Sequence, residues 1–237
     1  MDPLKENIKT EIFDKLQLKI DADAVEREQI KEITQTLERQ GRITLSMLSR
    51  AHSTPEAQLT PIILEAENLI KDEIKTVGEL ANLASKSPYY KHNSIWSRDV
   101  QTVIFSIIYC GWLGGMGMKS SPPSQGKLLS IDECGDILNV PVNLQDRDAF
   151  HITIEEYLQS LITLIEELAR LAVNSVTLGD YRRPLQISKF VKDLHAGFQI
   201  LNLKNDLLRR RSDSIKYNVK KVEDIVYDLS LRNLVPK

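Results

Sequence analysis

Apolar residues recur every three or four positions along most of the chain, which is the spacing of amphipathic α-helices. In the first half this spacing predicts helices near residues 8–16, 30–48, 60–83 and 89–113. The apolar positions of the first three are Ile8, Ile12 and Leu16, then Ile30, Ile33, Leu37, Leu45 and Leu48, then Leu64, Ile70, Ile74, Leu80 and Leu83. Thr60 and Pro61 form the N-cap and first-turn pair of the third helix, and the segment Ser85–Pro88 ends it.

The second half continues the helical spacing and carries two signatures of helix starts. Ser130 with Glu133, and Thr153 with Glu156, each place a polar cap three residues before an acid, which is the capping box. The later apolar stripes are Leu161, Ile165, Leu168 and Ala172, then Phe190, Leu194, Phe198 and Leu201, then Val219, Val222, Val226 and Leu229, with a break between the first two at Gly179 and Pro184. No segment alternates with period two for long, so we predict an all-α, single-domain bundle of about seven helices over residues 1–237. We expect the last stripe to pack between subunits and the others to form the core.

Composition supports a folded protein with a sizeable core. Of the 237 residues, 42% are apolar. The longest apolar run, Val103–Met118, is shorter than a bilayer span and predicts a buried helix, so we expect no membrane partner. Cys110 and Cys134 lie in different segments without a partner motif, so we expect both to be small buried residues. The N-terminus carries no apolar core of a secretory signal, so export is not indicated.

The charge is unevenly distributed along the chain. The formal net charge is −2, which alone does not indicate a nucleic-acid-binding protein. Residues 182–237, however, hold 13 lysines and arginines against 6 aspartates and glutamates, which gives this segment a charge of +7 and leaves −9 for residues 1–181. One surface of the protein could therefore attract phosphates while the rest stays acidic.

Signatures of the common catalytic and cofactor sites are incomplete. The string Gly114–Ser120 resembles a phosphate-binding loop, but Met118 stands where that motif requires glycine before the lysine. No nucleophile elbow is present in the sequence. The histidines stand singly and do not follow a zinc-ligand spacing, so we expect surface or capping roles for His52, His92, His151 and His195. We therefore expect no metal and no other cofactor.

Aromatic and basic residues alternate at the start of the fourth predicted helix. Aromatic rings can stack on unpaired bases while cations neutralise phosphates, a combination suited to sequence-tolerant binding of single strands. The candidates for nucleic-acid contact here are Tyr89, Tyr90, Lys91, His92, Trp96 and Arg98. In the alternative interpretation the aromatic residues simply pack the start of the helix.

A second basic cluster lies near the C-terminus. Lys216 and Lys220 are one helical turn apart and form a local positive ridge. The candidates for phosphate contact in this cluster are Arg209, Arg210, Arg211, Lys216 and Lys220. A solvated charged face is the alternative.

The block Phe150–Arg232 resembles the translin family. The resemblance is carried by EELARLAVNSVTLGDYRRPLQISKF and LNLKNDLLRRRSDSIKYNVKKVEDIVYDLS, with the unusual strings NSVTLGDY and LNLKND. It implies a helical protein of the cytoplasm and nucleus that binds single-stranded RNA and DNA and assembles into a hollow homo-octamer. Family members carry a basic segment after a paired tyrosine, where this chain keeps Lys91 but has Asn93, Ile95 and Ser97 at positions that tend to be basic or histidine. These departures imply weaker binding or a shifted preference between RNA and DNA.

The resemblance also suggests a role without catalysis. The family's catalytic subunit, translin-associated factor X, acts in an endoribonuclease and uses acidic residues on two neighbouring helices. Glu167 matches one such position, but Thr163 stands one turn earlier and the matching run Phe105–Leu113 has no carboxylate. We therefore expect a non-catalytic RNA-binding subunit that partners translin-associated factor X. A magnesium-dependent endoribonuclease using Glu167 and a protein-binding structural adaptor remain as alternatives.

Overall fold

The computed structural model describes residues 10–117, 125–204 and 206–235. Their helices confirm the predicted all-α bundle, and within these ranges the only β-type pairing is one bridge between Val142 and Ile152. The α-helices are α1 (Thr10–Ser49), α2 (Thr60–Ala84), α3 (Tyr89–Trp112), α4 (Ile131–Leu138), α5 (Ile154–Thr177), α6 (Arg183–Ile200), α7 (Asp206–Ser212) and α8 (Ile215–Leu231), with the 3-10 turns η1 (Arg50–Ser53) and η2 (Glu56–Gln58) between α1 and α2.

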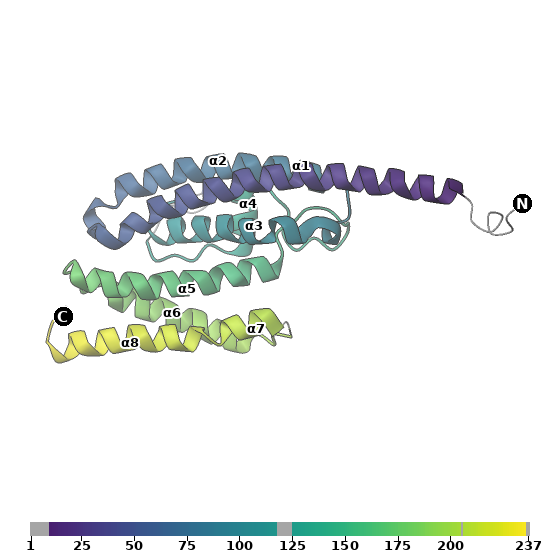
Figure 1. The fold of residues 1–237 in the computed structure, drawn as a ribbon. Coiled ribbons are helices and arrows are strands. Elements are labelled where there is room, and N and C mark those ends of the chain that lie inside the picture. Colours follow the sequence, from purple (N-terminus) through teal and green to yellow (C-terminus); the bar gives the residue numbers. More distant parts are fainter. Residues whose placement is uncertain (1–9, 118–124, 205, 236–237) are drawn as a thin grey trace, which may run out of the picture.

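The helices are arranged in successive rows (Figure 1). Helices α1 and α2 form an antiparallel hairpin, and α3 packs against both of them. On its other side α3 packs against α5, which in turn packs against α6 and α8. Helix α3 thus joins the N-terminal hairpin to the C-terminal helices.

The predicted buried helix is confirmed in α3. Every residue from 103 to 113 is buried, so the helix is enclosed on all sides rather than along one stripe. The run contains two hydroxyls: Ser106 donates a hydrogen bond to the carbonyl of Thr102 at 3.0 Å, whereas the buried Tyr109 hydroxyl has no hydrogen-bond partner among the described residues. A search of the described helices found none with both the length and the apolar character needed to cross a bilayer.

Both cysteines are free thiols in the core, as the sequence predicts. Cys110 on α3 and Cys134 on α4 are fully buried. Burial raises the pKa of each thiol to about 12, so both stay protonated near neutral pH.

Both predicted capping boxes are present. The backbone N–H of Glu133 donates to Ser130 Oγ at 3.1 Å, and the Ser130 N–H donates to Glu133 Oε2 at 2.8 Å. At the start of α5 the same reciprocal pair joins Thr153 and Glu156, at 3.1 and 2.9 Å. The two helices therefore begin at the residues that the local sequence specifies.

The N-terminal region differs from the prediction. The first two predicted helices are one continuous helix, α1, and Ile8 lies outside the described residues. Every residue from 12 to 25 is exposed, including Ile12 and Leu16, because this part of α1 projects beyond the other helices (Figure 1). The prediction that Leu64 on α2 lies in the core is also wrong, since this residue is 55% exposed. Residues 118–124 of the predicted glycine-rich loop lie outside the described residues.

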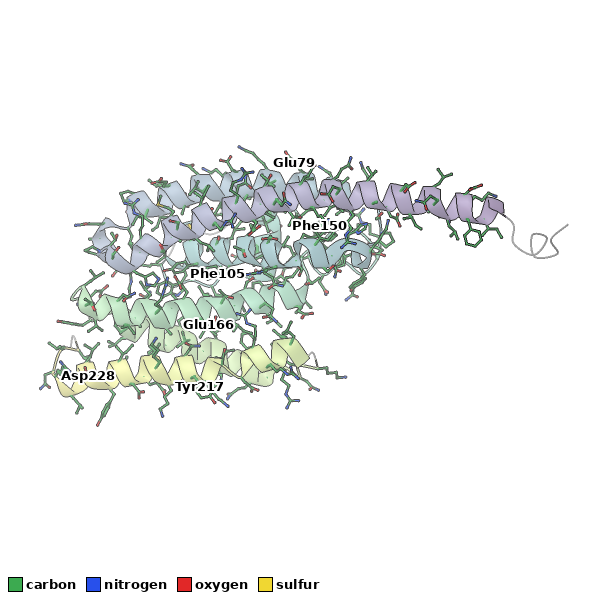
Figure 2. The ribbon with its side chains drawn as sticks, viewed as in Figure 1. Glu79, Phe105, Phe150, Glu166, Tyr217 and Asp228 are labelled. Carbon is green, nitrogen blue, oxygen red and sulfur yellow. The ribbon has the colours of Figure 1, made fainter. Side chains whose placement is uncertain are left out.

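The last apolar stripe does not form the predicted subunit seam. Val219, Val222 and Leu229 are buried within the chain itself, where α8 packs against α5 and α6. Because these side chains are already covered, a second subunit cannot use them. The exposed large residues of α8 lie off this stripe, and Figure 2 shows Tyr217 among them at the outer side of the helix.

A buried carboxyl lies between α1 and α2. Glu73 is fully buried, and its Oε1 accepts a hydrogen bond from Thr44 Oγ1 at 2.6 Å. Its Oε2, like the buried Gln40 Oε1, has no hydrogen-bond partner among the described residues. Burial raises the pKa of Glu73 to about 7, and the hydrogen bond from Thr44 only partly opposes this rise.

Glu73→Gln should remove a pH dependence from the stability of the protein. The pKa of Glu73 is about 7 in the folded chain against 4.5 ordinarily, so the folded state binds the proton more tightly. The resulting stabilisation is complete below pH 4.5 and is lost as the pH rises through 7. Over that range the free energy of unfolding from urea titrations should fall by up to about 3 kcal/mol because of this group. The glutamine variant should lack that fall.

Glu79→Gln is the matched control, because Glu79 is exposed on the same helix (Figure 2). It should leave the pH dependence of the unmodified chain in place. Equal pH dependence in the Glu73→Gln variant and the unmodified chain would contradict the assignment.

Candidate nucleic-acid interface

Two of the three predicted base-stacking residues are core residues. Helix α3 begins directly after Pro88, and the backbone N–H of Tyr89 donates to Asp148 Oδ1 at 2.7 Å. Tyr89 and Trp96 are 2% and 1% exposed, with ring centroids 5.8 Å apart in an edge-on arrangement. A buried ring cannot stack on a base, so the burial favours the alternative that both residues pack the start of the helix.

Tyr90 differs from its two aromatic neighbours. Its side chain is 76% exposed, and its ring meets the ring of Tyr89 edge-on at a centroid distance of 5.1 Å. The contact with a buried ring holds Tyr90 in place at the surface. Of the three predicted aromatic residues, it is the one whose ring face a base could reach.

The cations next to these aromatic residues are neutralised by α1. Lys91 Nζ lies 2.7 Å from Asp23 Oδ1 and 3.0 Å from Glu26 Oε2, and these hydrogen bonds raise the pKa of Lys91. His92 is 7% exposed, and its Nε2 lies 3.5 Å from the same Glu26 oxygen. The two residues therefore tie α3 to α1, and the predicted phosphate contact of the exposed Lys91 stays a prediction.

Arg98 is exposed two turns further along α3. Its charge acts on the neighbouring Asp99: burial raises the pKa of that carboxyl, as does the charge of Glu38, while Arg98 and Arg42 oppose the rise. Among the predicted residues of this segment, Tyr90 and Arg98 are thus the two that are exposed and form no ion pair with the described residues of α1.

Four of the five predicted C-terminal cations lie at the surface. Arg209 and Arg210 on α7 and Lys216 and Lys220 on α8 are exposed. Lys216 Nζ lies 5.0 Å from the ring centroid of Tyr217, a cation–π contact that keeps the ammonium at the surface. The four charges thus lie on α7 and the first half of α8, where Arg209 and Lys216 line one pocket and Lys220 lines another.

Arg211 is the exception in this cluster. It is half-buried and donates hydrogen bonds to Gln159 Oε1 at 2.9 Å and Thr163 Oγ1 at 3.1 Å. Its Nη2 also lies 3.5 Å from Glu166 Oε2. Arg211 therefore fastens α7 to α5, which corrects its predicted contact with phosphates.

Glu167, the candidate catalytic residue, is held in an intramolecular cluster. Its Oε1 lies 2.7 Å from His52 Nε2 on η1 and 2.7 Å from Arg170 Nη2 on α5. Burial alone would raise the pKa of Glu167, but the hydrogen bonds and charges of His52 and Arg170 outweigh it and leave the pKa below its ordinary value. The carboxylate is therefore ionised and already has two donors.

His52 has a larger role than the surface or capping role that the sequence suggests. Besides Glu167, its ring contacts Asn174, whose Nδ2 lies 3.0 Å from His52 Nδ1. Arg170 Nη2 also lies 3.0 Å from His52 Nε2, so Glu167, Arg170 and Asn174 form one polar cluster around the His52 ring. The contact between His52 and Glu167 joins residues 115 positions apart, so no sequence spacing could reveal it.

The two neighbouring acids of α5 point to different partners. Glu166 contacts Arg211 and Ser214, so it faces α7 and α8, as Figure 2 also shows. Glu167 faces η1 instead. Within the described residues, no three His, Cys, Asp or Glu side chains converge in an arrangement that could hold a metal ion.

Comparison with known proteins places this fold. The model of the Translin family matches residues 25–233. Translin of Gallus gallus and translin of Homo sapiens are each 37% identical over 227 residues, covering 94% of this chain and 93% of the relative. Translin-associated protein X of Rattus norvegicus is 22% identical over 233 residues, covering 95% of this chain and 80% of that protein.

Two solved structures share the fold at low identity. AfC3PO in a duplex RNA complex superposes with a TM-score of 0.65 at 12% identity, covering 94% of this chain and 98% of that chain. Apo-NeC3PO superposes with a TM-score of 0.57 at 14% identity, covering 91% and 95%. Since the family model spans α2 to α8 and most of α1, and the translins match nearly end to end, the chain belongs to the translin family.

Proposed function

We propose that this protein binds single-stranded RNA and DNA through its α7–α8 edge, which we define by Arg209, Arg210, Lys216 and Lys220. The observation that carries the proposal is the exposure of these four cations on a protein whose formal net charge is −2. Figure 1 shows α7 and α8 in the row farthest from α1 and α2, at the outside of the bundle. A localised basic surface on an acidic protein attracts phosphates without promoting nonspecific binding over the rest of the surface.

The surface contacts favour unpaired strands over duplex. Tyr90 offers an exposed ring on α3, and Tyr217 offers another on α8 beside Lys216. Exposed aromatic faces beside cations suit bases that are not already stacked in a helix. AfC3PO was solved with duplex RNA, so duplex is a necessary arm of any binding assay.

Assembly is part of the same proposal. The exposed part of α1 carries six large apolar side chains, a high density for a soluble surface. They are Ile12, Phe13, Leu16, Leu18, Ile20 and Val25. A helix this exposed is marginally stable by itself, so contact with further subunits would stabilise it. We propose a homo-octamer, and a mixed endoribonuclease complex of the cytoplasm and nucleus in which translin-associated factor X supplies catalysis.

Removing charge from the α7–α8 edge should weaken binding and its salt dependence together. Arg210→Ala combined with Lys220→Ala should lower the slope of log affinity against log salt by roughly 1.4 for single strands, about 0.7 for each lost phosphate contact. Binding of a labelled single-stranded RNA, a single-stranded DNA and a duplex would be measured by fluorescence anisotropy at several salt concentrations.

Lys31→Ala combined with Lys75→Ala is the matched control. Lys31 is partly exposed on α1 and Lys75 is exposed on α2, and each is paired with an acid one turn away. The control should retain the full salt slope. Equal losses in the two double variants would show that total charge, rather than the α7–α8 edge, governs binding.

Glu167→Ala should destabilise the protein without abolishing a nuclease activity. The change leaves His52 and Arg170 without their shared acceptor, which should lower the free energy of unfolding by about 1–2 kcal/mol. Stability would be measured in urea, and cleavage of labelled single-stranded RNA with magnesium would be measured for the chain alone and in the mixed complex. Cleavage by the purified unmodified chain that Glu167→Ala abolishes would support the endoribonuclease alternative instead.

The adaptor alternative predicts a different result. A chain that serves only to bind proteins should retain no single-stranded RNA even at low salt.

Glu166→Ala provides the stability control for Glu167→Ala, because Glu166 makes weaker contacts, at 3.5 Å to Arg211 and 3.4 Å to Ser214, and its side chain is 43% exposed.

A further inference from the structure

A polar pocket lies where α6, α7 and α8 meet. Its volume is about 470 Å³, within the range of about 300–1,000 Å³ typical of small-ligand sites. The C-terminal part of α6 forms one wall with His195 and Phe198, and Asn202 follows the C-cap residue Leu201. Arg209 of α7 and Lys216 of α8 line it from the other side. The pocket thus collects two of the four cations of the α7–α8 edge.

No described acidic side chain forms an ion pair with either cation, so both can bind an anionic ligand. Neither Arg209 nor Lys216 forms an ion pair with any side chain that the structure describes, in contrast to Lys192, whose Nζ lies 2.9 Å from Glu223 Oε1. Lys216 Nζ contacts only a ring face, at 5.0 Å from the centroid of Tyr217. One carboxylate, Asp213, also lines the pocket, so its formal charge is +1 with a neutral His195.

The remaining lining suits a base and a sugar. Leu201 supplies an apolar wall, since it lines the pocket and is 43% exposed, whereas the side chain of Phe198 is held in the core at 7% exposure. The Asn202 amide can donate to and accept from the edge of a base, while Asp213 can accept from an amino or sugar hydroxyl group. Ser212 Oγ already donates to the Arg209 carbonyl, so it stays available only as an acceptor.

We propose that this pocket holds one unpaired nucleotide of a bound strand, with its phosphate against Arg209 and Lys216 and its base against Leu201 and Asn202. The inference rests on the proposed function and adds a specific subsite to it. A base within a duplex is paired and stacked and cannot enter a pocket, so occupancy of this site selects single strands. The pocket therefore supplies discrimination that the exposed charges alone lack.

The test compares adjacent arginines. Arg209 lines the pocket, whereas the exposed Arg210 does not, so Arg209→Ala and Arg210→Ala remove the same charge from neighbouring positions. Binding of AMP and UMP to the full-length protein would be measured by NMR titration. Arg209→Ala should weaken it about tenfold, as expected for a lost charge-assisted hydrogen bond, and Arg210→Ala less than about twofold. Asn202→Ala, which changes no charge, should weaken nucleotide binding severalfold.

Selectivity for single strands gives an independent readout. Asn202→Ala should lower the affinity for a short unstructured RNA more than the affinity for the matching duplex, whereas Arg210→Ala should lower both to a similar degree. Thermal unfolding of each variant would show that it is folded. Asn218→Ala is the matched amide control, because Asn218 lies on α8 outside the pocket, where its amide donates to the Ser214 carbonyl.

Several outcomes would overturn the inference. Equal losses of nucleotide binding in Arg209→Ala and Arg210→Ala would leave only nonspecific attraction. Inorganic phosphate that binds as tightly as AMP would mean an anion site without a role for the base. Retention of RNA by a protein that binds no AMP would overturn the inference and leave the proposed function standing. AMP binding without RNA retention would overturn both, because the pocket would then hold no part of a bound strand.

Discussion

The structure depends on the enclosure of α3. A helix whose residues 103–113 are all buried needs neighbours on every side, and here the α1–α2 hairpin, α4 and α5 provide them. This requirement fixes where α5 lies, and α5 then places α6 and α8. The same apolar run, Phe105–Leu113, contains no carboxylate, so this part of α3 presents no acid to Glu167 on α5.

Several cations that the sequence analysis assigned to nucleic-acid contact form hydrogen bonds and ion pairs within the chain. Lys91 pairs with Asp23 and Glu26 across 68 and 65 positions of sequence, and Arg211 reaches Gln159 across 52. Such long-range partners are invisible to a local pattern, since a basic cluster looks the same whether it faces solvent or a neighbouring helix. The packing of α1 on α3 and of α7 on α5 is what distinguishes these internally bonded residues from the exposed Arg209, Arg210, Lys216 and Lys220.

What the sequence could predict follows the same division between local and distant interactions. The capping boxes at Ser130 and Thr153 join residues three positions apart, so both were correctly located in advance. The apolar stripes gave the helix type of every long element, because burial imposes the helical period. The prediction failed in α1, where residues 12–25 are exposed and no core dictates a stripe. It failed again in α8, whose stripe is equally compatible with a core and a subunit interface.

The position of the α7–α8 edge is compatible with the binding of an anionic polymer that we propose for this acidic protein. The exposed apolar part of α1 and the exposed cations of α7 and α8 belong to opposite rows of the bundle (Figure 1). An assembly that covers the α1 surface therefore need not cover the cations. The same separation keeps Lys216 and Arg209 away from Asp23 and Glu26, which neutralise Lys91 at the start of α3. Interactions between exposed charges are screened within about 10 Å at moderate salt, so the net charge of −2 does not prevent the basic edge from attracting phosphates locally.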